Sequence, residues 1–253
     1  MNDFNMKEKI KLLKKWSLDN NIPEDNLKKV FEMLYLGKRS DRTESDPIQF
    51  PSFYIKDEEA SAWRNVKKYS WVSLLEANFL EIKKEALSIF EEELMDIHPK
   101  NDDLAGYGTN TFSFYKNGEK ILENHQRCPL TSKVLEQIDG VEVAGRTYFT
   151  AMPPGVHVKP HCGPHNFKLR THLGLVTPQE AVIRVGDVTK PWREGECIIF
   201  DDSFEHEVWN RSNRTRIVMI VDTWNPILKQ AEIKALEYVM HEFYNKSSET
   251  INA

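Results

Sequence analysis

A strict alternation marks the stretch Leu169-Arg170-Thr171-His172-Leu173-Gly174-Leu175. Because successive side chains of a β-strand point to opposite faces, the stretch predicts a strand with Arg170, His172 and Gly174 on one face. Comparable short runs, separated by turn residues, predict strands at 111–115, 147–152, 169–176, 181–185, 196–200, 205–209 and 215–222. Many short strands joined by turns are typical of a β-sandwich or barrel, including the jelly roll. The sequence therefore predicts a mainly β core with flanking helices.

Helical periodicity lies on both sides of this β-rich region. Residues 1–36 predict two helices, and a polar linker is expected over 38–46. A long helix is expected over 71–97 with Ser70 as its cap, a further helix over 130–139, and a last one from 226 onward. The predicted organisation is a helical extension and linker at 1–49, a β-rich domain with a bracing helix at 50–226, and a helix and tail at 227–253. Residues 1–36 are either a packing element or a docking element for a carrier or partner protein.

Composition excludes several classes of partner. The chain has 253 residues, a net charge of −5 and a pI of about 5.9, so a broad basic surface for nucleic acid is not expected. The apolar runs are too short to span a bilayer, and the N-terminus lacks the apolar core of a signal peptide. Three cysteines without a Cys-x-x-Cys pair argue against a disulfide framework or a thiolate zinc site. We therefore expect a cytoplasmic protein with no nucleic-acid or membrane partner.

Two histidines, His161 and His206, are the candidate metal ligands. Neutral imidazole binds iron, copper, zinc and nickel, but a pair of histidines alone is a weak sign of a metal site. The residues around the two histidines strengthen the prediction of a metal site. Prolines and a glycine before His161 predict a loop that presents this residue to a cavity, and His206 begins a strand after the acidic turn Asp201-Asp202.

Two arginines are predicted to point inward from apolar strands. Arg170 shares its face with His172, and Arg216 alternates with apolar neighbours in the strand at 215–222. A buried positive charge is costly unless an anion meets it, and a guanidinium matches a carboxylate with two parallel hydrogen bonds. Taken singly, each arginine is equally consistent with a surface residue or a structural ion pair. Together with the histidines, they predict a metal site beside bound carboxylates.

Several of these motifs, in this order and spacing, resemble the aspartyl/asparaginyl β-hydroxylase family. They are His161-Cys162-Gly163-Pro164, the alternating stretch at 169–175, the segment from Phe200 through His206 to Trp209, and Arg216. The likeness runs from about residue 50 to residue 226. It implies an iron(II)- and 2-oxoglutarate-dependent oxygenase that uses O2 and is built on a double-stranded β-helix, a jelly roll similar to cupins.

The resemblance also implies roles for individual residues. His161 and His206 match the two iron ligands, and Gly163 stands where most 2-oxoglutarate oxygenases carry a carboxylate ligand, which this family lacks. The positions that hold 2-oxoglutarate are Thr150, His172 and Arg216, with Thr150 in place of a serine. The positions on the substrate side are Arg170, Lys168, Tyr115 and Tyr148, where the last two replace a tryptophan and a lysine.

The function implied is hydroxylation at the β-carbon of an Asp/Asn-like or other carboxylate-bearing amino acid, free, carrier-tethered or in a peptide. Succinate and CO2 are released. We hypothesise that Asp202, or as the alternative Asp201, accepts a hydrogen bond from an iron-bound water and restores part of the missing ligand charge. Two alternatives stay open: a non-catalytic module that binds a small anion, and a halogenase that uses the vacant carboxylate position.

Overall fold

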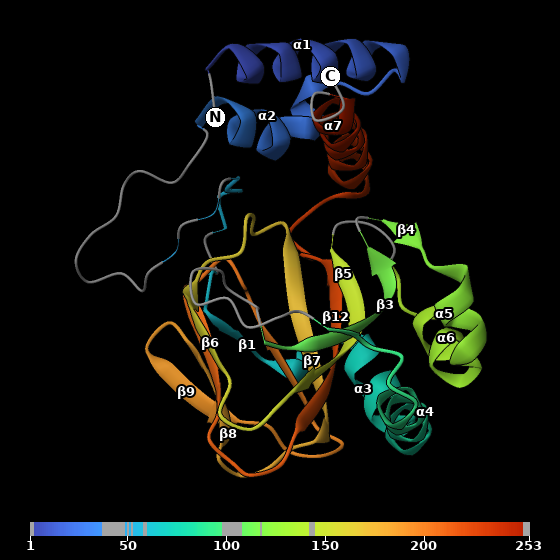
Figure 1. Ribbon diagram of the computed structural model, residues 1–253. Helices are drawn as coiled ribbons and strands as arrows, with labels where there is room; N and C mark the ends of the chain where they lie inside the picture. Colours follow the sequence, from blue (N-terminus) through green and yellow to red (C-terminus); the bar gives the residue numbers. More distant parts are fainter. Residues whose placement is uncertain are drawn as a thin grey trace.

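Two antiparallel sheets face each other in the computed structural model, which describes residues 3–36, 49, 51, 53–57, 60–97, 108–116, 118–141 and 145–249 (Figure 1). The predicted linker at 38–46 lies outside these residues, as do the side chains of 3–6, 36, 97 and 242–249. The larger sheet has the strand order β1-β10-β7-β12-β5-β3-β2, with β4 paired to β3. The smaller sheet has the order β6-β11-β8-β9. The predicted fold class, a mainly β jelly roll with flanking helices, is confirmed.

The strands of the larger sheet are β1 (Trp63–Arg64), β2 (Asp96–Ile97), β3 (Asn110–Lys116), β4 (Glu119–Lys120), β5 (Arg146–Met152), β7 (Lys168–Val176), β10 (Cys197–Phe200) and β12 (Arg216–Trp224). Those of the smaller sheet are β6 (His157–His161), β8 (Ala181–Val185), β9 (Val188–Pro191) and β11 (His206–Asn210). Apolar side chains from both sheets, among them Val158, Ile183, Phe200, Val208 and Ile220, form a buried cluster between them. This cluster surrounds the candidate site.

Only residues 153–156 of the loop predicted before His161 are irregular. The segment before His161 is the strand β6, which pairs with β11. Pro160 fits there because β6 is at the edge of its sheet, where a missing backbone N–H costs no ladder hydrogen bond. The register shifts between the pairs His206–His161 and Val208–Val158, so the strand is irregular where it carries the histidine.

Four helices cover the outer face of the larger sheet: α3 (Ser70–Ala77), α4 (Phe79–Glu91), α5 (Leu122–Arg127) and α6 (Pro129–Leu135). The single long helix predicted over 71–97 is wrong, because the chain leaves helical geometry at Asn78 (φ −104°, ψ 17°). The Asn78 side-chain amide donates to the Leu74 carbonyl. It thereby replaces the backbone N–H that would bind this carbonyl if the helix continued. Ser70 is the first helical residue rather than the cap, since Tyr69 occupies that position.

The helices from the two ends of the chain pack together above the sandwich (Figure 1). They are α1 (Asp3–Asp19), the short 3-10 helix η1 (Glu24–Leu27), α2 (Lys28–Leu36) and α7 (Gln230–Glu249). The predicted apolar face of the second helix is confirmed, because Leu27, Val30, Phe31 and Leu34 are buried in one cluster with residues of α7 and with Phe167 and Trp224. The division at residue 49 stays a prediction. No described helix combines the length and apolar character needed to cross a bilayer.

Candidate active site

The two candidate metal ligands lie side by side on neighbouring strands of the smaller sheet. His161 of β6 is the register partner of His206 of β11, and the centroids of their rings are 4.1 Å apart. In each ring Nδ1 contacts a backbone carbonyl, that of Lys159 at 2.8 Å and that of Phe204 at 2.9 Å. An imidazole that donates from Nδ1 to a carbonyl keeps the Nε2 lone pair for a metal ion.

Burial keeps both imidazoles in the neutral form that binds metals. It lowers the pKa of His206 to about 3, and the nearby His161 adds to this effect. Burial also lowers the pKa of His161, which is half-buried. Among the residues that the structure describes, no third His, Cys, Asp or Glu joins them in a group that could hold a metal ion. The chain therefore offers two nitrogen ligands at this point.

Gly163 is tightly covered by Asp202. A Cβ atom placed on Gly163 would lie 2.7 Å from Asp202 Cγ and 2.8 Å from its Oδ1, closer than such atoms approach in proteins. The Gly163 N–H donates to the Asp202 carbonyl at 2.6 Å. Position 163 thus has no room for a ligand side chain, because the carboxylate of Asp202 already fills that space.

Asp202 belongs to a buried group of four charges. Its Oδ2 accepts from Lys168 Nζ at 2.6 Å and lies 3.0 Å from Arg170 Nη1. Asp222 binds Arg170 through two hydrogen bonds of 2.8 Å, and its Oδ2 lies 3.3 Å from Lys168 Nζ. Burial alone would raise the pKa of Asp202, but Arg170 and Lys168 outweigh it and hold that pKa well below its usual range. Two cations and two anions therefore neutralise one another beside the histidines.

A second group of polar residues lies on the side of the predicted cosubstrate. Trp192 Nε1 donates to His172 Nδ1 at 3.2 Å, so the proton of the neutral imidazole is on Nε2. Burial holds the pKa of His172 well below its usual range, and Nε2 is a buried atom without a partner in the described structure. Arg216 lies with its guanidinium carbon 4.9 Å from the centre of the Trp192 ring. Its Nε is likewise buried without a partner, and burial lowers the pKa of Arg216 to about 10.

A cavity of about 340 Å³ joins the histidines to both groups. Its wall contains the predicted residues His161, His206, Arg170, His172, Arg216, Thr150 and Tyr148, together with Thr109, Thr111, Arg146, Val158, Ile183, Phe200, Val208 and Ile220. The other predicted residues are not in this wall. Lys168 and Asp202 are buried in the charged group, and Tyr115 is buried with its ring centroid 4.8 Å from that of His125.

Three residues of the site were missing from the sequence-based prediction. Trp192 lies outside every predicted strand and gave no signal. Asp222 and Arg146 did give one, because residues two, four or six positions apart on a strand share a face. That rule places Asp222 with Arg216 on β12, and Arg146 with Tyr148 and Thr150 on β5.

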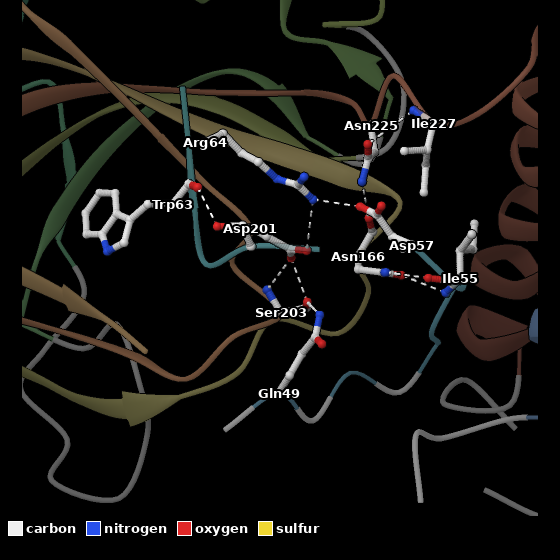
Figure 2. Close-up of polar contacts among 11 residues, drawn as sticks. Gln49, Ile55, Asp57, Trp63, Arg64, Asn166, Asp201, Ser203, Asn225 and Ile227 are labelled. Carbon is white, nitrogen blue, oxygen red and sulfur yellow. Dashed lines mark hydrogen bonds and ion pairs between the residues drawn. The ribbon is translucent and has the colours of Figure 1, made fainter. Parts of the chain in front are cut away.

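A polar network behind the site holds the acidic turn in place (Figure 2). Asp201 Oδ1 accepts from the backbone N–H of Ser203 at 3.0 Å and from its hydroxyl at 2.6 Å, and Gln49 donates to the same hydroxyl at 2.7 Å. Arg64 lies between two carboxylates, with Nη2 2.8 Å from Asp57 Oδ2 and 4.0 Å from Asp201 Oδ2. The turn before His206 is thus fixed by residues from a distant part of the chain.

Comparisons with known proteins agree with this geometry. The model of the aspartyl/asparaginyl beta-hydroxylase family matches residues 76–226. The human aspartyl/asparaginyl beta-hydroxylase is 35% identical over 185 residues, which make up 70% of this chain and 24% of the human protein. An ornithine lipid ester-linked acyl 2-hydroxylase from Rhizobium tropici is 33% identical over 172 residues, which make up 64% of this chain and 60% of that protein.

A third relative, aspartate beta-hydroxylase domain-containing protein 2 from Mus musculus, is 31% identical over 204 residues, or 76% of this chain and 59% of that protein. The chain thus spans about a quarter of the length of the human relative and under two thirds of the other two. The family match covers more than half of the chain and contains both histidines, the charged group, Trp192 and Arg216. The chain belongs to the aspartyl/asparaginyl β-hydroxylase family.

Proposed function

We propose that this protein is an iron(II)- and 2-oxoglutarate-dependent hydroxylase. The observation that carries the proposal is the pair of imidazoles, each fixed through Nδ1 so that Nε2 is left for a metal ion, beside a cavity that also contains an arginine without an acidic partner in the described structure. When bound, iron and 2-oxoglutarate supply the oxidising power, since oxidation of 2-oxoglutarate by O2 to succinate and CO2 accompanies insertion of one oxygen atom into a C–H bond.

The unpaired polar atoms of the cavity fit a keto diacid. Arg216 provides a buried guanidinium for the distal carboxylate, and it matches that group with two parallel hydrogen bonds. His172 provides a second donor, because Trp192 fixes the proton on Nε2. Thr150 adds a hydroxyl from the same cavity wall. Together these groups hold the cosubstrate while the two histidines hold the iron.

Asp202 would provide a negative charge close to the metal without binding the metal itself. Its Oδ1 is buried and has no hydrogen-bond partner in the described structure, whereas Oδ2 is bound by Lys168 and Arg170. A carboxylate fixed in this way would accept a hydrogen bond from a water ligand of a bound metal and would compensate part of the charge of the ion. The same carboxylate counts against a halogenase, because a chloride ion at position 163 would face a fixed negative charge at close range.

The proposed substrate is an Asp/Asn-like or other carboxylate-bearing amino acid, free, carrier-tethered or in a peptide, that is oxidised at its β-carbon. The positive charge of Arg170 in the cavity wall, with Lys168 buried behind it, supports this class. Tyr148 contributes to the same wall, whereas Tyr115 would act only through packing behind it.

An acyl chain is the second candidate substrate. It is favoured by the similarity to the Rhizobium tropici acyl 2-hydroxylase and by the apolar wall formed by Val158, Ile183 and Val208. The two candidate substrates differ in the charge they need in the cavity. A carboxylate-bearing amino acid binds a second cation there, whereas an acyl chain gains nothing from one.

Succinate release under air, with iron(II) and 2-oxoglutarate, tests the proposal. The wild-type protein should release succinate, and His206→Ala should lose both iron binding and turnover. His157→Ala is the matched control, because His157 lies on the same strand as His161 but its Nε2 contacts Glu207 at 3.0 Å instead of facing the cavity. Binding of 2-oxoglutarate without any succinate from the wild-type protein would favour the alternative of a non-catalytic anion-binding module.

A further inference from the structure

The cations in the cavity wall and directly behind it are not equally available to a ligand. Lys168 and Arg170 are already bound to Asp202 and Asp222 at 2.6 to 3.3 Å. Arg216 lies at the end proposed for 2-oxoglutarate. Arg146 is the remaining basic residue of the cavity wall, and no acidic side chain of the described structure forms an ion pair with it.

Arg146 is held in position by contacts that leave its charge unpaired. Its guanidinium carbon lies 4.9 Å from the centre of the Tyr148 ring, and its backbone N–H donates to Asp222 Oδ2 at 3.0 Å. The side chain is half-buried, and Nε is shielded from solvent without a hydrogen-bond partner in the described structure. Stacking on an aromatic ring restricts the guanidinium at little cost, so less freedom is lost when a ligand binds.

The strand register places Arg146 and Arg216 at opposite ends of the cavity. Arg216 pairs with Met152, Val218 with Thr150 and Ile220 with Tyr148, so Arg146 lies six residues further along β5 from Met152. At about 3.3 Å per residue, the two backbone positions are roughly 20 Å apart. Between them lie Thr150 and Tyr148 on the same face of β5. The cavity thus has one unpaired guanidinium at each end.

We propose that Arg146 binds an anionic group of the substrate beside Arg170, whose charge is already shared with Asp202 and Asp222. The inference rests on the proposed function and narrows its substrate from an Asp/Asn-like molecule to one that carries an anionic group. A substrate carboxylate can form two parallel hydrogen bonds with Arg170 only by displacing the buried carboxylate of Asp222. Arg146 can bind such a carboxylate without the loss of an internal ion pair. A cavity of about 340 Å³, shared with 2-oxoglutarate, has the size for an amino-acid side chain.

Equilibrium binding to the protein loaded with manganese(II) and 2-oxoglutarate, in the absence of O2, tests this inference independently of turnover. The probes are N-acetyl-aspartate N-methylamide and its asparagine isostere, and calorimetry gives their Kd values. We expect Arg146→Gln to weaken binding of the aspartate probe by about tenfold or more and to leave the asparagine probe and 2-oxoglutarate unchanged. Arg146→Lys should give an intermediate loss, because it keeps the charge but not the fork of donors.

Arg211→Gln is the matched control. Arg211 also stacks on an aromatic ring, with its guanidinium carbon 4.9 Å from the centre of Trp209, but it is exposed and does not line the cavity. It should bind both probes as the wild-type protein does. Thermal unfolding of every variant shows whether a loss of binding reflects a loss of folding.

Three outcomes would overturn the inference: equal weakening of both probes by Arg146→Gln, no change for the aspartate probe, or a wild-type protein that binds aspartate no better than asparagine. Failure of the proposed function gives a different pattern. A wild-type protein that releases no succinate yet loses aspartate selectivity with Arg146→Gln would disprove the hydroxylase and leave Arg146 as the anion-binding residue.

Discussion

Arg170 of β7 and Asp222 of β12 are register partners and form two parallel hydrogen bonds of 2.8 Å inside the protein. The pair lies next to the candidate metal site, and its arginine also contacts Asp202. Burial alone would lower the pKa of Arg170, but the two carboxylates outweigh this effect and raise that pKa well above its ordinary value. This arginine is therefore a fixed cation at every physiological pH.

Loss of Arg170 should destabilise the fold. Arg170→Ala leaves Asp202 and Asp222 short of one positive charge, and breaking a buried pair in this way costs about 3–5 kcal/mol. Urea unfolding measures the change in the free energy of unfolding. Arg184→Ala is the control, because Arg184 also binds two carboxylates but is partly exposed, and we expect about 0–1 kcal/mol there. Adding Asp222→Asn to Arg170→Ala should recover part of the loss, and a loss as small as that of the control would contradict the prediction.

Arg216 should determine the affinity for 2-oxoglutarate. Arg216→Gln removes the charge proposed to meet the distal carboxylate, and a hydrogen bond to a charged group is worth about 1.5–3 kcal/mol, or roughly 10- to 100-fold in Kd. Calorimetric titration with manganese(II) and 2-oxoglutarate measures this change. Arg214→Gln, two residues away on an exposed turn, should leave the Kd unchanged. An unchanged Kd for Arg216→Gln would place the cosubstrate elsewhere.

A carboxylate ligand cannot be added at position 163 by a single substitution. Gly163→Asp would bring its Cβ within 2.7 Å of Asp202 Cγ, so we expect a destabilisation of about 1–3 kcal/mol and weaker iron binding. Urea unfolding and the iron content after dialysis measure the two effects. The double variant Gly163→Asp with Asp202→Gly removes the side-chain part of the clash but leaves the carbonyl oxygen of residue 202 at 2.9 Å from the new Cβ, so it should regain part of the iron binding. Tighter iron binding by the single variant would show that Asp202 does not occupy this space.

Asp201 should make stability depend on pH. Burial raises its pKa to about 7, Ser203 donors oppose this shift, and the neighbouring charge of Asp202 adds to it. The folded protein therefore keeps a proton that the unfolded chain loses at about pH 4, so the contribution of Asp201 to stability falls as pH rises from about 4 to about 7. Asp201→Asn removes this dependence. The free energy of unfolding of Asp201→Asn, relative to that of the wild type, should therefore rise by on the order of 1–3 kcal/mol between about pH 5 and pH 8.

Urea unfolding at the two pH values checks the sign of this effect. Asp139→Asn is the control, because Asp139 is exposed and its variant should follow wild type at both pH values. If the stability difference between wild type and Asp201→Asn were the same at about pH 5 and pH 8, Asp201 would have an ordinary pKa.

Periodicity along single strands predicted much of the β core. The strands β5, β7, β8, β10, β11 and β12 lie within a few residues of the predicted ranges, and Arg170 and His172 face the cavity as the alternation of β7 requires. The roles of the site residues stay predictions, although the structure brings the two histidines and Arg216 to one cavity.

Other features depend on contacts between segments and could not be read from local pattern. The strand β6 contains a proline that only its place at a sheet edge makes acceptable. The break at Asn78 interrupts an apolar pattern that is continuous in the sequence. That Asp222 binds Arg170 follows from the register of β7 on β12, which no single strand reveals.

The network of Figure 2 determines where a shortened form of this protein can begin. Gln49, Asp57 and Arg64 all precede residue 76, where the family match begins, yet they hold Ser203 and Asp201 in the turn that leads to the candidate ligand His206. An expression boundary drawn at the edge of the family match would leave the carboxyl of Asp201 without the guanidinium of Arg64. A truncated variant made to test the proposed iron and 2-oxoglutarate binding should therefore start upstream of Gln49.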